Sequence, residues 1–474
     1  MRRKYGLWLA ISVLIPACLI FGEQRERPSG ANQDFQAAVA FYQRQQFGQA
    51  QQILAKLLDQ YPGDFELNEL MGLVYTGENN QNRASTYLAK AVQIKPQSAE
   101  ARMYLAANLV ELHQNAKAES EFKKAAAIEP ASYETNHNLG EFYIGVGKLG
   151  AAIPYLAKAQ QISPSSVNNG YDLALAQIKT GEFADAKTNL EHLLTYQNSA
   201  DLHSLLGTAD EHAGQSVQAA TEYQTAAHMD PSESNIFAWG SELLLHHTLE
   251  LAIQVLGRGV QLYPRSARMQ VGYGIALYSR GHYQDAIDAF CHAIDVNPKD
   301  PRPYTFLGKI YDVSPLQAAA VTGRFARYAA LQPHNAQALY YYAMSLWKAS
   351  RSENQTLDLP KVRKLLESAV AIEPAFAEAH LQLGILYAGQ RQWEAAISQY
   401  RQAIRRQPDL ADAHYRLGEA MVRAGQRAAA QNEFQTFNRL HQQQVKDEAK
   451  QRSEITQFVY TSGAPAQNAE GSKQ

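Results

Sequence analysis

The sequence contains little cysteine and no excess of either charge. Cys18 and Cys291 are the only cysteines among 474 residues, which excludes a disulfide scaffold and a four-cysteine zinc module. Lysine and arginine together number 44 and aspartate and glutamate 46, so the net charge of −2 lacks the basic excess of a nucleic-acid-binding protein. Hydrophobic residues make up 46% of the chain, enough to build a core, so we expect a folded protein without a nucleic-acid partner.

Motifs for catalysis and metal binding are also missing from the sequence. The segment most similar to a phosphate-binding loop has Val146 where a lysine should follow Gly145, so we interpret it as a turn. Adjacent His246 and His247 lack the i, i+4 spacing that places two ligands on one helix face. Three further histidines share one position of the repeat described below, which favours packing over metal ligation: His203, His380 and His414. We predict no enzymatic activity, no catalytic residues, no metal site and no cofactor.

The N-terminus carries the longest uncharged run. Arg2, Arg3 and Lys4 precede residues 5–22, which contain no charged side chain, and this pattern is typical of a signal peptide or a single membrane anchor. The protein is therefore predicted to be exported, either periplasmic or secreted, or anchored to the membrane by residues 5–22. Cleavage and retention both stay open, because this run is at the lower limit of a bilayer span. Lipidation at Cys18 is a weaker alternative.

The rest of the sequence repeats one motif at intervals of about 34 residues. Prolines mark the ends of the units: Pro62, Pro96, Pro130, Pro164, Pro231, Pro264, Pro298, Pro333, Pro374 and Pro408. A glycine or alanine recurs before most of these prolines, from Ala38 to Gly418, and a second series of alanines follows, from Ala50 to Ala430. Three series in phase indicate a repeat protein rather than several unrelated domains.

Two antiparallel helices explain this period, since about 34 residues hold two helices of roughly thirteen residues and two short turns. A glycine or alanine is required where the two helices cross, and bulky side chains of the second helix, such as Phe122, Tyr223 and Tyr400, fill the space beside it. Turn glycines supply positive φ within the hairpins: Gly147, Gly181, Gly214, Gly281 and Gly425. One pair cannot bury its own apolar face, so the pairs are expected to stack.

One unit carries most of the consensus of a known repeat: Gly384, Ile385, Leu386, Tyr387, Ala396, Tyr400, Ala403 and Pro408. These residues resemble the tetratricopeptide repeat family, and the similarity extends over about 410 residues. The resemblance implies an all-α fold, a right-handed superhelical solenoid of about twelve helix pairs. It also implies a concave groove, lined by the first helix of each pair, that binds segments of other proteins.

The sequence divides into four parts. Residues 1–22 are the signal peptide or anchor, and the polar residues 23–30 are expected to tether it to the solenoid. The solenoid spans residues 31–442, with an insertion near 352–360 that we expect to form a surface loop. Residues 443–474 lack the repeat and are predicted to form a polar cap followed by a disordered tail.

Binding is expected at the first-helix positions that the repeat leaves free to line the groove. In the N-terminal third these positions are acidic: Glu66, Glu69, Glu100, Glu134 and Glu141. Further along they become aromatic and basic: Phe237, Arg268, Tyr278, Arg302, Phe306, Lys309, Tyr340, Tyr341 and Trp347. Aromatic and arginine side chains most often anchor a bound segment, and packing between neighbouring first helices is the alternative role for them.

The sequence thus predicts a non-catalytic interaction scaffold, exported or membrane-tethered, whose partners are other proteins or peptide segments. An alternative is a cell-envelope assembly factor for pili or exported polysaccharide. An aromatic groove can stack on sugars, but no motif in the sequence supports a glycan directly. Membrane contact is predicted only through the N-terminal segment.

Overall fold

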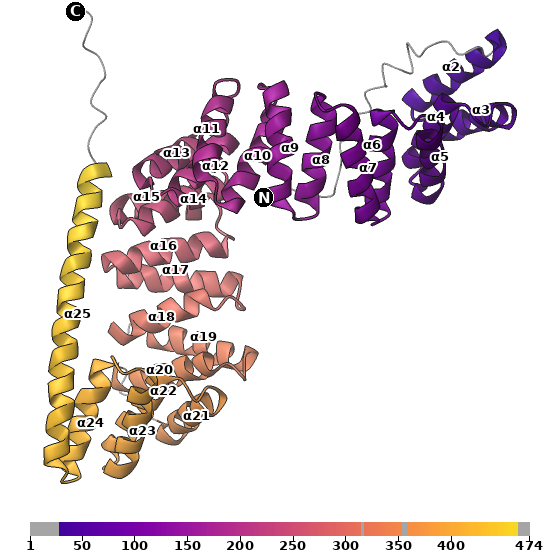
Figure 1. Cartoon of the computed structure of the whole chain (residues 1–474). Helices are drawn as coiled ribbons and strands as arrows, with labels where there is room; N and C mark the ends of the chain where they lie inside the picture. Colours follow the sequence, from indigo (N-terminus) through magenta and orange to yellow (C-terminus); the bar gives the residue numbers. More distant parts are fainter. Residues whose placement is uncertain (1–27, 314–316, 353–357, 463–474) are drawn as a thin grey trace, which may run out of the picture. The chain divides into compact units, whose positions relative to one another are not determined.

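The computed structural model describes residues 28–313, 317–352 and 358–462, which form 24 helices and no strand (Figure 1). The helices form twelve consecutive pairs. The first helices of the pairs are α2 (Ser29–Gln43), α4 (Phe65–Gly77), α6 (Ala99–Glu111), α8 (Tyr133–Gly145), α10 (Val167–Thr180), α12 (Ala200–His212), α14 (Glu233–Leu245), α16 (Ala267–Arg280), α18 (Arg302–Val313), α20 (Ala336–Ser352), α22 (Ala377–Gly389) and α24 (Ala411–Arg423).

The second helices of the pairs are α3 (Phe47–Gln60), α5 (Gln81–Ile94), α7 (Asn115–Ile128), α9 (Leu149–Ile162), α11 (Phe183–Leu194), α13 (Ser216–Met229), α15 (Leu249–Leu262), α17 (Tyr283–Val296), α19 (Ala318–Leu331), α21 (Leu359–Ile372), α23 (Trp393–Arg406) and α25 (Arg427–Ser462). The prediction of an all-α solenoid of about twelve helix pairs is confirmed.

The chain divides into two compact units, which we describe separately. The N-terminal unit, Met1–Met229, contains α2 to α13, and the C-terminal unit, Asp230–Gln474, contains α14 to α25. Within each unit the first helices of successive pairs lie against one another, except α20 and α22. Among the second helices of the described residues, only α17 and α19 come comparably close. The first helices therefore line the inner face of each unit, and the second helices spread over its outer face.

Close helix crossings hold each pair together, as the small-residue series predicts. A Cβ atom added to Gly384 of α22 would lie 2.4 Å from the ring of Tyr400 in α23. The same arrangement places Gly274 of α16 against Phe290 of α17, where the corresponding distance is 2.7 Å. The alanines of the second series are fully buried from Ala50 to Ala430, in keeping with their expected place at the crossings.

The turns within the pairs share one backbone conformation. The five predicted turn glycines have positive φ, with values up to 89° at Gly181 and Gly281. The corresponding turns of other pairs adopt positive φ without glycine: Gln45, Asn79, His113, His247 and Arg391. The repeat therefore imposes this conformation through its hydrogen bonds, such as that from the N–H of Gln392 to the carbonyl of Tyr387, and glycine only lowers its cost.

One helix begins earlier than the sequence predicts, and another continues into the predicted polar cap. Helix α2 begins at Ser29, inside the predicted tether, because the carbonyl of Pro28 accepts the N–H of Asn32 and starts the helix there. Helix α25 continues beyond residue 442 to Ser462, since no glycine or proline interrupts the sequence between these points.

Several predicted features lie outside the described residues. These are the signal or anchor segment, most of the tether, residues 353–357 of the insertion and the tail from residue 463 onward. The insertion is bounded by the end of α20 at Ser352 and the start of α21 at Leu359. Among the described helices, none is both long and apolar enough to cross a membrane.

Candidate functional site

The inner face of the N-terminal unit is strongly acidic. Its six first helices contain eleven acidic residues but only two basic ones, Arg102 and Lys179. The acidic residues are Asp34, Glu66, Glu69, Glu100, Glu111, Glu134, Glu141, Asp172, Asp201, Asp210 and Glu211. The six second helices instead contain eight lysines or arginines and six acidic residues. Negative charge is therefore concentrated on the helices that line the inner face.

The two basic residues do not neutralise this surface equally. The guanidinium of Arg102 forms an ion pair with Glu121 of the second helix α7, and its Nε donates to the carbonyl of Pro96. Arg102 is thus held between helices and faces away from the other first helices. Lys179 lies in the last turn of α10, at the far end of that helix from the acidic residues in the first turns.

A cluster of polar groups lies where α4 meets α6. Glu66 and Glu69 are three residues apart, so they lie on one face of α4. The carboxylate of Glu100 in α6 accepts a hydrogen bond of 2.8 Å from the hydroxyl of Tyr104. Glu69 is only 2% exposed, and its Oε1 atom is buried without a hydrogen-bond partner. The α4–α6 acidic cluster, as we call Glu66, Glu69 and Glu100, thus contains a buried carboxyl group with unused hydrogen-bonding capacity.

Burial and mutual repulsion perturb the ionisation of this cluster. Burial, together with the smaller repulsion from the carboxylates of Glu100 and Glu66, raises the pKa of Glu69 to about 8, while the charge of Lys95 acts in the opposite direction. Burial likewise raises the pKa of Glu100, against the hydrogen bond from Tyr104. A carboxylic acid that keeps its proton near neutral pH has lost solvation without gaining a cationic partner.

Farther along the inner face, α8 presents Glu134 and Glu141. The side chain of Glu134 is exposed, whereas the carboxylate of Glu141 lies 3.4 Å from Nε2 of His137. The ring of His137 stacks on Tyr133 at 5.1 Å, and its Nδ1 lies 3.0 Å from the amide oxygen of Asn169 in α10. This histidine therefore connects two neighbouring first helices.

The charge of His137 depends on Glu141. Burial lowers the pKa of His137, but the hydrogen bond and charge of Glu141, with smaller contributions from Asn169 and Asp172, raise it above the ordinary value. A raised pKa stabilises the fold at low pH, and this contribution is lost as the pH rises through the folded-state pKa. We expect Glu141→Gln to lower the pKa of His137, as measured by NMR titration of the imidazole; an unchanged pKa would contradict the coupling.

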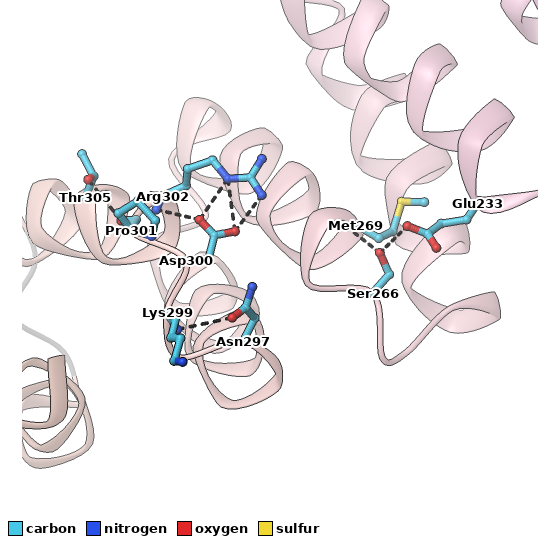
Figure 2. Close-up of polar contacts among 9 residues, drawn as sticks. All are labelled: Glu233, Ser266, Met269, Asn297, Lys299, Asp300, Pro301, Arg302 and Thr305. Atoms are coloured by element: carbon cyan, nitrogen blue, oxygen red, sulfur yellow. Dashed lines mark hydrogen bonds and ion pairs between the residues drawn. The ribbon is translucent and has the colours of Figure 1, made fainter. Parts of the chain in front are cut away.

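In the C-terminal unit, two of the predicted residues meet across neighbouring first helices. The guanidinium carbon of Arg268 in α16 lies 4.6 Å from the ring centre of Phe237 in α14, a cation–π contact. Arg268 also forms an ion pair of 3.1 Å with Glu233, which accepts a hydrogen bond from Ser266 (Figure 2). The side chain of Arg268 thus connects α14 to α16.

Three more of the predicted residues form an aromatic group around α18. The ring of Phe306 stacks on Phe290 at 5.5 Å and meets Tyr278 edge to face at 6.3 Å. The ammonium of Lys309 lies 5.5 Å from the ring centre of Phe306. Phe306 and Tyr278 are half-buried and Lys309 is exposed, so this group has its cationic end at the surface.

Arg302 is the first residue of α18 and forms a local contact instead of joining the aromatic group. Its guanidinium forms a two-pronged contact with the buried carboxylate of Asp300, with Nη2 at 2.6 Å from Oδ2 and Nε at 3.0 Å from Oδ1 (Figure 2). This contact holds the pKa of Asp300 below its ordinary value. The Arg302 side chain therefore stabilises the start of α18, although more than half of it remains exposed.

The remaining predicted residues lie mainly in the core of the C-terminal unit. Tyr340 is 9% exposed and packs against Phe376 at 5.0 Å, so it is a core side chain and does not line an accessible groove. Tyr341 is half-buried and fills the space beside Gly308 of α18, where an added Cβ would lie 2.5 Å from its ring. Trp347 is also half-buried against the core. These side chains are large enough to reach the neighbouring helix, so they pack between helices instead of lining an open groove.

Sequence reasoning missed a polar contact that recurs four residues before the small residue of the first helix. There the side chain reaches back to the carbonyl of the proline six residues earlier, as Asn68 does to Pro62 at 3.1 Å. His414 places Nε2 at 3.0 Å from the carbonyl of Pro408, and its Nδ1 lies 2.6 Å from Glu433. The spacing of six between a polar residue and a proline is the signal that points to this contact.

Reactive groups are sparse in the described part of the chain. No cluster of three or more histidine, cysteine, aspartate or glutamate residues there is arranged to hold a metal ion. Burial raises the pKa of the Cys291 thiol to about 11, which leaves this cysteine protonated and inert at neutral pH.

Family models match five segments of the chain. Models described as tetratricopeptide repeats match residues 34–64, 65–98, 143–209 and 237–301, and a model described as a TPR repeat matches residues 390–425. Together with the helix pairs and their crossings, these matches identify the family. The chain is a tetratricopeptide repeat protein.

Solved structures with similar folds are distant in sequence. A chain of the APC/C hetero-tetramer Cut9–Hcn1 is 14% identical, with 92% of this chain and 97% of that chain covered and a TM-score of 0.38. Yeast Tom70 is 14% identical, with 90% and 96% covered and a TM-score of 0.37. PilF of Pseudomonas aeruginosa is 17% identical, with 43% and 94% covered and a TM-score of 0.36. No curated protein matches the chain.

Proposed function

We propose that this protein is a non-catalytic interaction scaffold that binds segments of partner proteins on the inner face of its first helices. The observation that carries this proposal is the separation of charge between the two layers of the N-terminal unit. Helix packing does not require eleven acidic residues on the inner helices and most of the lysines and arginines on the outer ones. A surface of one charge that is also concave favours binding.

We also propose that the scaffold is exported or tethered to a membrane. This part rests on the sequence of residues 1–22, where a basic start precedes an uncharged run. Such a location would place the partners of the scaffold in the cell envelope or outside the cell.

Site-specific photo-crosslinking tests the binding face. A benzoylphenylalanine in place of the exposed Glu134 of α8, or of the exposed Lys309 of α18, is expected to capture partner protein in the native host. The matched control is the same substitution at the exposed Lys158 of the outer helix α9, which is expected to capture little. Equal capture from inner and outer positions would refute the assignment of the inner face.

A further inference from the structure

A network of polar side chains joins α8 to α10 and to the outer helix α9. It starts at Gln160 of α9, whose Nε2 donates to the carbonyl of Pro164 at 2.8 Å, so its Oε1 is the atom that accepts. Asn169 of α10 is fully buried, and its Nδ2 donates to Oε1 of Gln160 at 2.8 Å. The same Nδ2 donates to the carbonyl of Leu156 at 2.9 Å. The remaining amide atom, Oδ1 of Asn169, lies 3.0 Å from Nδ1 of His137 in α8.

The two backbone carbonyls fix the direction of every hydrogen bond in this network, because a carbonyl can only accept. The carbonyl of Leu156 requires the amide nitrogen of Asn169 beside it, which leaves the amide oxygen toward the imidazole. Nδ1 of His137 therefore carries a hydrogen whether the ring is charged or neutral. The neutral ring is the Nδ1–H tautomer, and its Nε2 then holds an unprotonated lone pair.

Nε2 of His137 faces a carboxylate. Oε1 of Glu141, one turn later in α8, lies 3.4 Å from it, and Asp172 of α10 adds a second negative charge that acts on the ring. The outer helix α9 contributes the uncharged side chain of Gln160 and a backbone carbonyl to the network. The N–H of a protonated ring attracts the carboxylate of Glu141. In the neutral ring a lone pair meets the carboxylate oxygen, and the same contact becomes repulsive.

Of these two side chains, Glu141 is the one that can move. The ring of His137 stacks on Tyr133 at 5.1 Å and is held by Asn169, and its side chain is only 17% exposed. The side chain of Glu141 is 32% exposed, so its carboxylate can turn toward water and regain hydration. Loss of the proton therefore moves the carboxylate and leaves the ring in place.

We propose that protonation of His137 holds the carboxylate of Glu141 against the imidazole, and that loss of the proton releases this carboxylate to the inner face of the N-terminal unit. The proton passes from Nε2 to solvent, and the bond from Nδ1 to Asn169 stays. Because the pair of imidazolium and carboxylate is nearly neutral, the inner face gains one negative charge at α8 as the pH rises through the midpoint of the histidine titration. This inference rests on the proposed function in one respect, that it makes partner binding near α8 sensitive to pH.

NMR spectroscopy of the imidazole tests the tautomer. The full-length protein is labelled with ¹⁵N in its histidine rings and titrated with base, and His137→Asn identifies the resonances of this ring by their absence. Above the midpoint of the titration, we expect a hydrogen on Nδ1 and none on Nε2. A neutral ring with its hydrogen on Nε2 would mean that Asn169 does not accept from the imidazole, and it would overturn the proposal.

Melting temperatures on the two sides of this midpoint test the release. On the acid side, Glu141→Gln is expected to melt roughly 2 °C below the wild type, because glutamine cannot pair with the imidazolium. On the basic side the two proteins are expected to melt together, since the carboxylate has already left the ring. The control is Glu134→Gln, a change of an exposed residue of the same helix, which is expected to shift the melting temperature equally on both sides. Circular dichroism confirms that both variants keep the helical content of the wild type.

The outcomes separate this inference from the proposed function. An equal difference between Glu141→Gln and the wild type on both sides, including no difference, would mean that the contact does not depend on the proton. A variant more stable than the wild type on the basic side would mean that Glu141 stays against the neutral ring. Either result overturns the proposal and leaves the proposed function standing, because neither measurement needs a partner. If crosslinking from Glu134 captures no partner, the proposed function fails, and the proton-dependent contact between α8 and α10 remains.

Discussion

Gly384→Leu is expected to lower the free energy of unfolding by roughly 3 kcal/mol. A Cβ at this position would lie 2.4 Å from the Tyr400 ring, and 3.0 Å from its far carbon, so a larger side chain cannot fit beside the ring. Tyr400 is 1% exposed, so its ring cannot move aside without opening the crossing of α22 and α23. Urea unfolding followed by circular dichroism measures the effect.

Two further variants separate the crossing from other effects of the substitution. Gly389→Ala changes a glycine at the end of the same helix where no atom lies within 4 Å of the added Cβ, so it is expected to be nearly neutral. Tyr400→Ala in the Gly384→Leu background is expected to recover part of the lost stability, because the leucine then occupies space vacated by the ring. Wild-type stability of Gly384→Leu would mean that the pair does not cross at this glycine.

The second large effect is the dependence of stability on pH through Glu69. Its pKa of about 8 in the folded protein exceeds the ordinary value of 4.5, so the folded state holds a proton that the unfolded chain releases. The contribution of this group is favourable below pH 4.5 and is lost progressively as the pH rises to about 8. Each unit of pKa difference corresponds to about 1.4 kcal/mol, so the loss is on the order of a few kcal/mol.

Glu69→Gln removes this titration while it preserves the shape of the side chain. We expect the variant to match the wild type in unfolding free energy at pH 4.5 and to exceed it by a few kcal/mol at pH 8.5. Asp59→Asn, a change of an exposed carboxylate on α3, serves as the control and is expected to follow the wild type at both values. Parallel profiles for Glu69→Gln and the wild type would show that Glu69 is ionised in the folded protein.

Much of the fold could be predicted because each helix crossing requires a small residue, and these residues recur in the sequence at a regular spacing. The crossing of Gly384 with Tyr400 requires a residue without a large side chain, and this requirement returns in each unit with the same spacing. The turns were less predictable. Arg391 and Gln45 adopt positive φ at positions where only glycine suggests it, since the surrounding hydrogen bonds impose the conformation on these residues.

The candidate site was predictable in charge but not in exposure. The register of the repeat correctly placed Glu66, Glu69 and Glu100 on first helices, because charge and helix position follow directly from the sequence. Whether a side chain on that face meets solvent or a neighbouring helix depends on packing between units of the repeat. Glu69 and Tyr340 are both buried for this reason, although the register assigns them to the groove.

Photo-crosslinking in the native host tests the central claim most directly, because it compares inner and outer helices of the same protein. With benzoylphenylalanine in place of Glu134 of α8 or Lys309 of α18, the account predicts capture of partner protein, and it predicts little capture from the same substitution at Lys158 of α9. Equal capture from the inner and outer positions would contradict the account.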